Sequence, residues 1–261
     1  MAKNVPKGHP RFLSLSIREK LVVGLKKGIV VPHGLLAHGR GEAFDYLLGE
    51  RTINRAIHAE KVACSLLLLS NNPVISVNGN VAALCCKEIV ELSNVVNAKL
   101  EVNLYHRSKK RSRIIGNMLR ENGAKSVLGI QTDPQFLIGG ISSNRKFVDD
   151  RGIGCADTVL LGLEDGDRAG ALINSGKKVI SIDLNPLSRT SQSSTIAIVD
   201  NIVRAIPNMI RLAKDLSNWD KAELLRLVSK FNNKLNLLHA TNFIRYGVGS
   251  SECSIIPTKV I

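Results

Sequence analysis

The spacing of hydrophobic positions along the chain changes at about residue 73. Before that point, residues 10–27 and 52–70 carry apolar side chains at helical intervals, and Ser14 or Ser16 can cap the first of these helices. Residues 32–45 lie between them, are rich in glycine and histidine, and are too polar for a buried strand, so we expect a loop there. The pattern therefore predicts a helical N-terminal extension.

From residue 73 onward, short apolar runs alternate with helical stretches. The predicted strands cover residues 74–77, 100–104, 126–130, 158–161, 179–182 and 195–199. The predicted helices cover residues 81–97, 108–122, 201–216 and 219–238, and Gly123 ends the second of them. Short buried strands that alternate with helices are typical of a mostly parallel sheet with helices on both faces, so the sequence predicts a three-layer α/β fold.

We expect three segments along the chain: a helical extension packed on the core (1–72), the α/β core (73–216), and a C-terminal helix and tail (217–261). No apolar run approaches the length of about 18–20 residues that crosses a bilayer, and the first residues lack the apolar stretch of a secretory signal. The five cysteines show neither a CxxC pair nor a zinc-binding spacing with histidine, which indicates reduced thiols in a cytoplasmic protein.

The net charge of +14 is the unusual feature of the composition, which is otherwise that of a soluble globular protein. Such a charge attracts anions, either nucleic acid or small phosphorylated molecules. The densest basic stretch, residues 107–113, opens a predicted helix and has only Tyr105 nearby to stack on a base. A solvated helix face, contact with a phosphorylated substrate and nucleic-acid binding all remain open for this stretch, with nucleic acid the least favoured.

Polar clusters directly follow several of the predicted strands. They comprise Asn78 to Asn80, Asn103 with Arg107, residues 164–168, residues 183–190, and Asp200 with Asn201. In an open parallel sheet, ligands bind beyond the carboxyl ends of the strands. The shared position of these clusters therefore predicts a ligand site at that edge.

The turn at residues 78–80 joins a predicted strand to a predicted helix without a glycine-rich nucleotide fingerprint. Neither G-x-G-x-x-G nor G-x-x-x-x-G-K-[ST] occurs in the chain, which disfavours a Walker-type site and a dinucleotide-dependent enzyme. Gly79 permits a positive φ, and the N–H groups at the helix start can hold an anion. An ordinary turn with an asparagine cap is the alternative.

The segment 183–190 follows a strand and offers groups that suit a nucleotide. A carboxylate at the position of Asp183 can accept hydrogen bonds from two ribose hydroxyls. Asn185 and Thr190 can bind a base edge, and Arg189 offers a fork for phosphate. An Asx turn with a surface arginine is the alternative interpretation.

Two further segments suggest binding of phosphates or of a metal. Residues 164–168 contain three carboxylates that can hold Mg²⁺ beside a phosphorylated substrate, or can simply open a helix. Arg40, in the glycine-rich segment, is always charged and can bind phosphate through two hydrogen bonds. His33 and His38 match no zinc pattern, so a phosphate contact through Arg40 is favoured over a metal site.

Five stretches, at residues 9–20, 32–52, 76–80, 163–168 and 182–190, resemble those of the archaeal phosphopantothenate synthetases. The resemblance runs from about His9 to Pro207 and cannot be followed beyond it. It implies a Rossmann-like homodimer that ligates 4-phosphopantoate to β-alanine in coenzyme A biosynthesis. ATP would be cleaved to AMP and pyrophosphate through an acyl-adenylate, and a basic chain working with Mg²⁺ suits that chemistry.

The resemblance also implies roles for residues at matching positions. Arg18 and Arg40 would contact the phosphates of ATP. The rest of the ATP site would comprise Asp183, Leu184, Asn185, Arg189, Thr190 and Asn201. Asn78, Asn80 and Arg107 are candidates for phosphopantoate binding, and Arg40, Asn78 and Asn80 are the candidate catalytic residues. The metal ligands stay unassigned, and a basic RNA-binding protein and a nucleotide-dependent oxidoreductase are the alternative functions.

Overall fold

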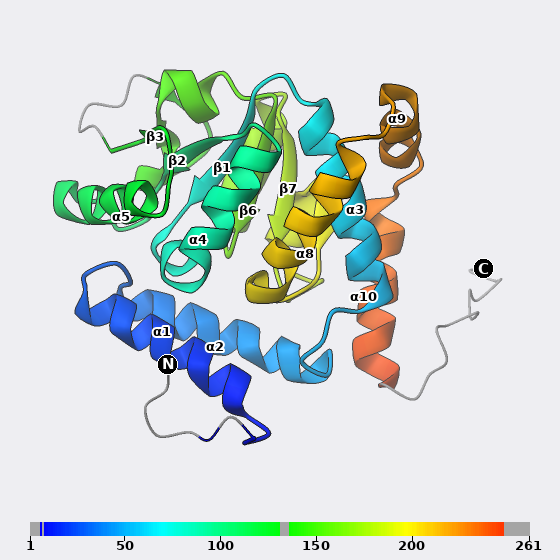
Figure 1. Cartoon of the computed structure of the whole chain (residues 1–261), viewed down its shortest axis with the longest axis horizontal. Coiled ribbons are helices and arrows are strands. Elements are labelled where there is room, and N and C mark those ends of the chain that lie inside the picture. The colour runs from blue at the N-terminus through cyan, green and yellow to red at the C-terminus, as the bar shows by residue number, and fades with distance from the viewer. Residues whose placement is uncertain (1–5, 7, 131–135, 248–261) are drawn as a thin grey trace.

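The computed structural model describes Pro6, residues 8–130 and residues 136–247, and its centre is a six-stranded parallel sheet (Figure 1). The order of the strands is β3 (Val127–Leu128), β2 (Lys99–Val102), β1 (Pro73–Val77), β6 (Thr158–Gly162), β7 (Lys178–Ile182) and β8 (Ile196–Ile198). This is the order 3-2-1-4-5-6 of Rossmann folds, so the predicted α/β class is confirmed. The order reverses between β1 and β6, and ligands bind at such a switch point.

The strands are aliphatic because both faces of the sheet are covered. Every residue of β1 and of β6 is buried. Ile75 of β1 lies between Leu100 of β2 and Leu160 of β6, and these side chains belong to the largest hydrophobic cluster. Val74, the neighbour of Ile75, points to the opposite face and joins a second cluster. The two clusters are the two layers of core on either side of the sheet.

Helices form the outer layers of the fold. One face is covered by α3 (Asn54–Leu69), α4 (Gly79–Val95), α5 (Lys109–Glu121) and α8 (Ile202–Leu216). The other face is covered by α6 (Gly166–Asn174), by the hairpin of β4 (Phe136–Leu137) and β5 (Phe147–Val148), and by the helical turns Asn144–Lys146 and Asp150–Gly154. The predicted three layers are therefore present, although the hairpin and the two turns were not predicted.

Of the predicted extension at residues 1–72, two helices, α1 (Phe12–Lys26) and α2 (Pro32–Leu47), lie together across one end of the sheet (Figure 1). The third, α3, belongs to the helical layer on one face. The prediction of a loop at residues 32–45 was wrong. Proline at the first position of α2 suits a helix start, but glycine inside a helix costs about 1 kcal/mol relative to alanine. Contacts with the sheet edge compensate for this weak propensity, and no local pattern reports them.

The C-terminal part also differs from its prediction. The single helix predicted at residues 219–238 is two helices, α9 (Lys221–Ser229) and α10 (Asn233–Tyr246). Asp220 and Asn232 cap their starts, and each side chain accepts a hydrogen bond from the backbone N–H three residues later. The two caps explain the break, and the predicted tail after residue 247 lies outside the described residues.

The described residues contain neither a membrane-spanning helix nor a disulfide bond. None of their helices has both the length and the apolar character that crossing a membrane requires. The four cysteines among them, Cys64, Cys85, Cys86 and Cys155, are free thiols. Cys253 lies outside the described residues.

Candidate active site

Helix α2 follows the carboxyl edge of the sheet and touches three of the predicted strand-end clusters. Near its start, Asn80 Nδ2 donates a hydrogen bond to the carbonyl of Gly34 at 2.8 Å. In its second half, a side chain on Gly41 would come within 3.7 Å of Leu184, which follows β7. Close to its end, Asn201 Nδ2 donates to Asp45 Oδ2 at 2.7 Å. One helix therefore connects the loops after β1, β7 and β8.

Two of the predicted phosphate-binding arginines belong to this helical pair. Arg18 of α1 donates from Nε to the two carboxylate oxygens of Glu42 at 3.0 and 2.9 Å and from Nη2 at 2.7 Å. These hydrogen bonds raise the pKa of Arg18. Arg40 lies exposed on α2, close enough to Asp183 to affect the pKa of its carboxyl group. The structure thus brings Arg18, Arg40 and Asp183 to the same edge.

The loop after β7 is an Asx turn centred on Asp183. Its Oδ1 accepts a hydrogen bond from the backbone N–H of Asn185 at 3.0 Å, and its Oδ2 accepts one from the hydroxyl of Ser188 at 2.5 Å. Burial raises the pKa of Asp183, while these two hydrogen bonds and the charge of Arg40 oppose the rise. Each carboxylate oxygen can still accept a second hydrogen bond. The turn therefore orients the carboxylate without using up its capacity.

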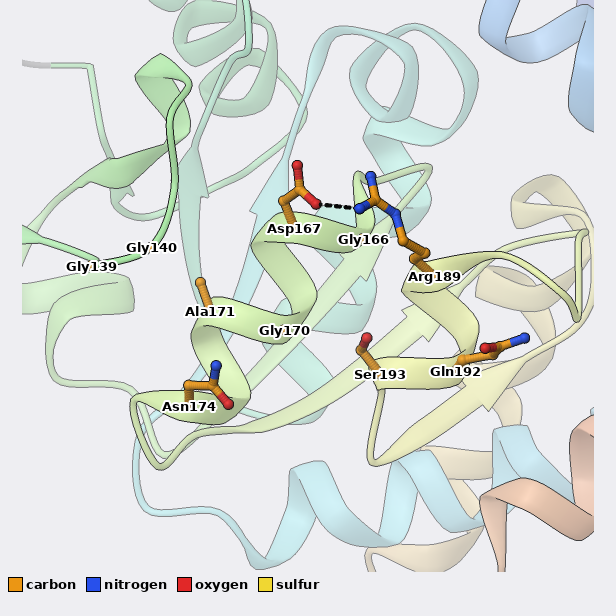
Figure 2. Close-up of a pocket in the computed structure, with 10 residues that line it drawn as sticks. All are labelled: Gly139, Gly140, Gly166, Asp167, Gly170, Ala171, Asn174, Arg189, Gln192 and Ser193. Carbon is orange, nitrogen blue, oxygen red and sulfur yellow. Dashed lines mark ion pairs between the residues drawn. The ribbon is translucent and has the colours of Figure 1, made fainter.

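Ser188 also caps α7 (Arg189–Ser193), which begins at Arg189, the third arginine predicted to bind ATP. Arg189 Nη1 lies 2.9 Å from Asp167 Oδ1, and the two side chains are 79% and 63% exposed (Figure 2). Thr190, in contrast, is buried, and its hydroxyl donates to the carbonyl of Glu164 at 2.7 Å. Arg189 can reach a ligand, whereas the side chain of Thr190 connects two loops.

A cavity of about 390 Å³ lies beside Arg189 and over the outer face of α6 (Figure 2). Its walls are Gly139, Gly140, Gly166, Asp167, Gly170, Ala171, Asn174, Arg189, Gln192 and Ser193. Gly139, Gly140 and Gly170 leave this surface open because they carry no side chain, whereas Gly166 allows Arg189 to approach closely. The cavity lies next to the predicted nucleotide loop.

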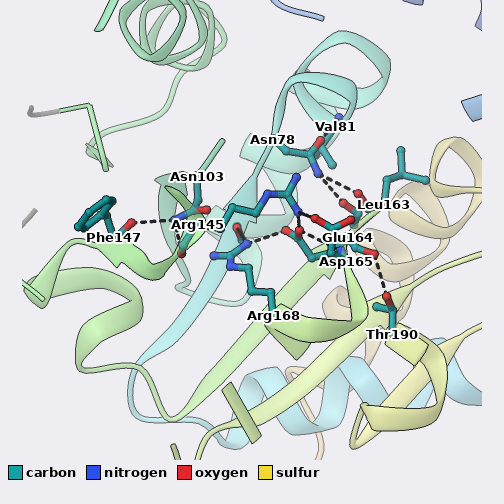
Figure 3. Close-up of polar contacts among 12 residues, drawn as sticks. Asn78, Val81, Asn103, Arg145, Phe147, Leu163, Glu164, Asp165, Arg168 and Thr190 are labelled. Atoms are coloured by element: carbon teal, nitrogen blue, oxygen red, sulfur yellow. Dashed lines mark hydrogen bonds and ion pairs between the residues drawn. The ribbon is translucent and has the colours of Figure 1, made fainter. Parts of the chain in front are cut away.

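The candidates for phosphopantoate binding follow β1 and β2. Asn78 is buried, its Oδ1 accepts from the N–H of Val81, and its Nδ2 donates to the carbonyls of Gly162 and Leu163 at 2.8 and 3.2 Å (Figure 3). The asparagine cap considered for this turn is therefore present. Asn78 also fastens the loop after β1 to the loop after β6, at the switch point of the sheet.

Gly79 and Arg107 complete this side of the edge. Gly79 does not adopt a positive φ; it begins α4 and lies against the carbonyl of Ile29 and the guanidinium of Arg111, where a Cβ would collide. Glycine is required there by the close approach of two segments and not by the backbone angle. Arg107 is half-buried and donates to the carbonyl of Phe147 at 3.4 Å.

The acidic segment at residues 164–168 opens α6, as its alternative interpretation predicted. Glu164 is buried between the guanidinium groups of Arg145 and Arg168, and the latter is 2.6 Å away (Figure 3). Burial lowers the pKa of each arginine to about 10, so both remain charged at neutral pH. A carboxylate held by two cations does not suit a magnesium ligand, and no group of three metal-binding side chains occurs within the described ranges.

No role at this edge was predicted for Asp45, Thr52 and Arg204, and Asp200 was placed there without its partners. Asp45 pairs with Arg204 at 2.5 Å, and Arg204 also pairs with Asp200 at 2.6 Å. Asp200 accepts a hydrogen bond from the hydroxyl of Thr52 at 2.6 Å. A helical interpretation of residues 32–45 would have placed Glu42 and Asp45, three residues apart, on one face of a helix. That spacing was the one sequence feature that could have indicated a shared role for the two carboxylates.

Asn201 and Leu184, both predicted to line the nucleotide, are buried. Asn201 Oδ1 accepts from the N–H of Val203 at the start of α8, and Nδ2 is bonded to Asp45. These two side chains shape the site from behind. The groups that face outward are Arg18, Arg40 and Arg189, each of them a cation at the carboxyl edge.

The strand order and the arginines at this edge define the chain as a Rossmann-like α/β protein with a carboxyl edge suited to anions. A sequence model of the phosphopantothenate/pantothenate synthetase family matches residues 55–247, and the chain belongs to that family. The predicted resemblance is confirmed, and it extends well beyond Pro207. Family membership favours a ligase over an RNA-binding protein or a dinucleotide-dependent oxidoreductase.

Curated relatives carry the name 4-phosphopantoate--beta-alanine ligase. The protein from Thermococcus kodakarensis is 49% identical over 93% of this chain and 92% of its own length. The proteins from Thermococcus onnurineus and Methanosarcina mazei are 50% and 48% identical, and they cover 88% and 93% of this chain and 87% and 94% of their own lengths. The similarity therefore spans nearly the whole chain.

Proposed function

We propose that the protein joins 4-phosphopantoate to β-alanine with cleavage of ATP to AMP and pyrophosphate, a step of coenzyme A biosynthesis. Its family and its relatives, named as ligases for these two substrates, support the reaction. The observation that supports the proposal is that Arg40 lies close to Asp183 and Arg189 follows the Asp183 loop at the carboxyl edge, while Arg18 is held to α2 through Glu42. That arrangement suits a polyphosphate beside a ribose.

The first chemical step brings two anions together. A carboxylate oxygen of 4-phosphopantoate attacks the α-phosphorus of ATP, and pyrophosphate leaves with the electrons of the broken P–O bond. Like charges repel at this distance, so the site has to neutralise both reactants and the charge that develops on the leaving group. Arg18 and Arg40 would neutralise the triphosphate, and a guanidinium is always charged and can bind two phosphate oxygens at once.

The second step forms the amide. The amine of β-alanine attacks the acyl carbon of the acyl-adenylate, AMP leaves with the electrons of the C–O bond, and the amine loses its proton. No covalent bond to the protein is required. The contribution of the chain is to hold the reacting atoms in line and to exclude competing water.

Asp183 would accept hydrogen bonds from the ribose hydroxyls, and Asn185 would face the base. Leu184, Thr190 and Asn201 would act from behind this surface, because their side chains are buried. Arg107 would bind the phosphate of 4-phosphopantoate, and Asn78 and Asn80 would fix the turns that meet at the switch point. Arg189 would complete the triphosphate contacts from the start of α7.

Mg²⁺ would enter with ATP, because magnesium in such sites is bound largely through substrate phosphates and water. Glu164 is not available to it, since that carboxylate is held between Arg145 and Arg168. A homodimer in the cytoplasm completes the proposal.

The test is direct. The purified protein is incubated with ATP, Mg²⁺, 4-phosphopantoate and β-alanine, and AMP and the amide product are quantified. Arg40→Ala should lose most of the activity with an unchanged circular dichroism spectrum, whereas Arg226→Ala, an exposed arginine on α9, should behave as the wild type. Near-normal turnover of Arg40→Ala would contradict the assigned site, and absence of AMP with the wild type would contradict the function.

A further inference from the structure

The ion pair between α1 and α2 joins a buried anion to a half-exposed cation. The side chain of Glu42 is 9% exposed and that of Arg18 is 44% exposed. A buried carboxylate costs free energy unless it is fully paired, so the guanidinium of Arg18 is held where it pairs with both oxygens of Glu42. Arg18 therefore has its backbone on α1 and its guanidinium fixed from α2.

The contact with Glu42 occupies one edge of the Arg18 guanidinium and leaves the other edge available to a ligand. Nε and Nη2 both donate to Glu42, which fixes the plane of the group. In the part of the chain that the structure describes, Nη1 makes no hydrogen bond. Nη1 and the second N–H of Nη2 form a planar fork, and such a fork matches two oxygens of a phosphate.

Glu42 is itself held in place because α2 is fastened at both ends. Asn80 bonds to Gly34 near the start of the helix, and Arg204 and Asn201 bond to Asp45 near its end. A free arginine side chain loses much rotational freedom when it binds a ligand. An arginine whose orientation is already fixed loses less rotational freedom on binding, and the smaller entropy cost increases the affinity for the ligand.

We propose that Glu42 is a positioning residue for the nucleotide: it holds the guanidinium of Arg18 so that the free fork of that arginine receives a phosphate of ATP. The proposal rests on the proposed ligase function. Glu42 does not touch the substrate; it acts through Arg18. Its removal therefore affects ATP more than β-alanine.

The experiment is a double-mutant cycle on the full-length protein. Glu42→Gln, Arg18→Ala and the double variant are compared with the wild type for KM of ATP, KM of β-alanine and kcat, and thermal unfolding checks that each is folded. Glu91→Gln is the matched control, because Glu91 lies 2.7 Å from Lys214, the same distance as in the Glu42 pair, but on the surface. Glu42→Asp, which keeps the charge on a shorter side chain, is the second variant.

We expect Glu42→Gln to raise KM for ATP about tenfold and to leave KM for β-alanine within about twofold. In the Arg18→Ala background the same change should have little further effect, since residues that act as one unit are not additive. Glu42→Asp should recover part of the ATP affinity. The proposal is overturned if the effects of Glu42→Gln and Arg18→Ala on KM for ATP add up, or if Glu42→Gln and Glu91→Gln change that KM equally. Ligase activity of the wild type would still support the proposed function in either case.

Discussion

Asn201, which ends the loop after β8, donates its side-chain amide to the buried carboxylate of Asp45, 156 positions earlier in the chain, at 2.7 Å. The same carboxylate pairs with Arg204 of α8. This contact fixes the end of α2 to the sheet, and α2 carries Arg40 and Glu42. The geometry of the candidate site therefore depends on a pair of residues that touch no substrate in the proposed mechanism.

Replacement of Asp45 by alanine should lower the free energy of unfolding by about 3 kcal/mol, because it leaves the side-chain amide of Asn201 unpaired and removes one of the two buried carboxylates that pair with Arg204. Urea denaturation with an unchanged slope measures the loss. Lys214→Ala is the control, since it removes an ion pair of similar length that is exposed and should change stability by less than about 1 kcal/mol. Equal losses in the two variants would contradict the structural role of Asp45.

Replacement of Gly79 by alanine should destabilise the protein by about 2 kcal/mol and reduce its activity, because the added Cβ has to displace the backbone of Ile29. Gly39 is the matched control: it lies in α2 with open space where a Cβ would be, so alanine there should stabilise the helix by about 0.5–1 kcal/mol. Thermal unfolding of the two variants separates the effects. A stable Gly79→Ala would show that the turn can move away from Ile29.

Replacement of Arg189 by alanine should leave stability within about 0.5 kcal/mol, because the pair with Asp167 is exposed. It should raise KM for ATP about tenfold if the guanidinium binds a phosphate. Asp167→Ala removes the same ion pair but keeps the cation, so KM for ATP should stay near the wild-type value. Steady-state kinetics measures KM for ATP in both variants. An equal change in the two would refute the assignment of Arg189 to the phosphate.

The stability of the protein should fall between pH 7 and pH 9 because of Glu60. This residue of α3 is fully buried, and burial, with the nearby charge of Asp200, raises its pKa from 4.5 to about 9. The folded state then keeps a proton that the unfolded chain releases above about pH 4.5, so the free energy of unfolding decreases as pH rises toward 9. Glu101, whose pKa burial raises to about 7, adds to the decrease only below that value.

Glu60→Gln should remove most of this decrease, because glutamine does not titrate. Denaturation at pH 7, 8 and 9 on both proteins gives the comparison. Glu91→Gln, at a partly exposed position, should keep the wild-type dependence. An identical decrease in Glu60→Gln would show that another group is responsible.

The sequence alone determined where along the chain the six strands of the main sheet lie and at which edge the polar loops gather, whereas the order of the strands in the sheet came from the structure. Buried parallel strands need continuous aliphatic runs, such as those of β1 and β7, and these runs can be recognised locally. The caps and turns at Asn78 and Asp183 were also predictable, because short polar side chains bond to backbone groups two or three residues away.

Only the tertiary structure decided that residues 32–47 form a helix and that Glu42, Asp45 and Glu164 serve as anchors. Glycine and histidine give that segment a weak local preference, and its stability comes from contacts with loops that follow in the chain much later. Arg18 and Arg204, the partners of Glu42 and Asp45, lie on other helices, and Arg145 reaches Glu164 from a segment without a regular pattern; only Arg168, four residues after Glu164, is a local partner. A buried charge is stable only where the fold brings an opposite charge next to it, and a local sequence pattern does not show which distant residue that will be.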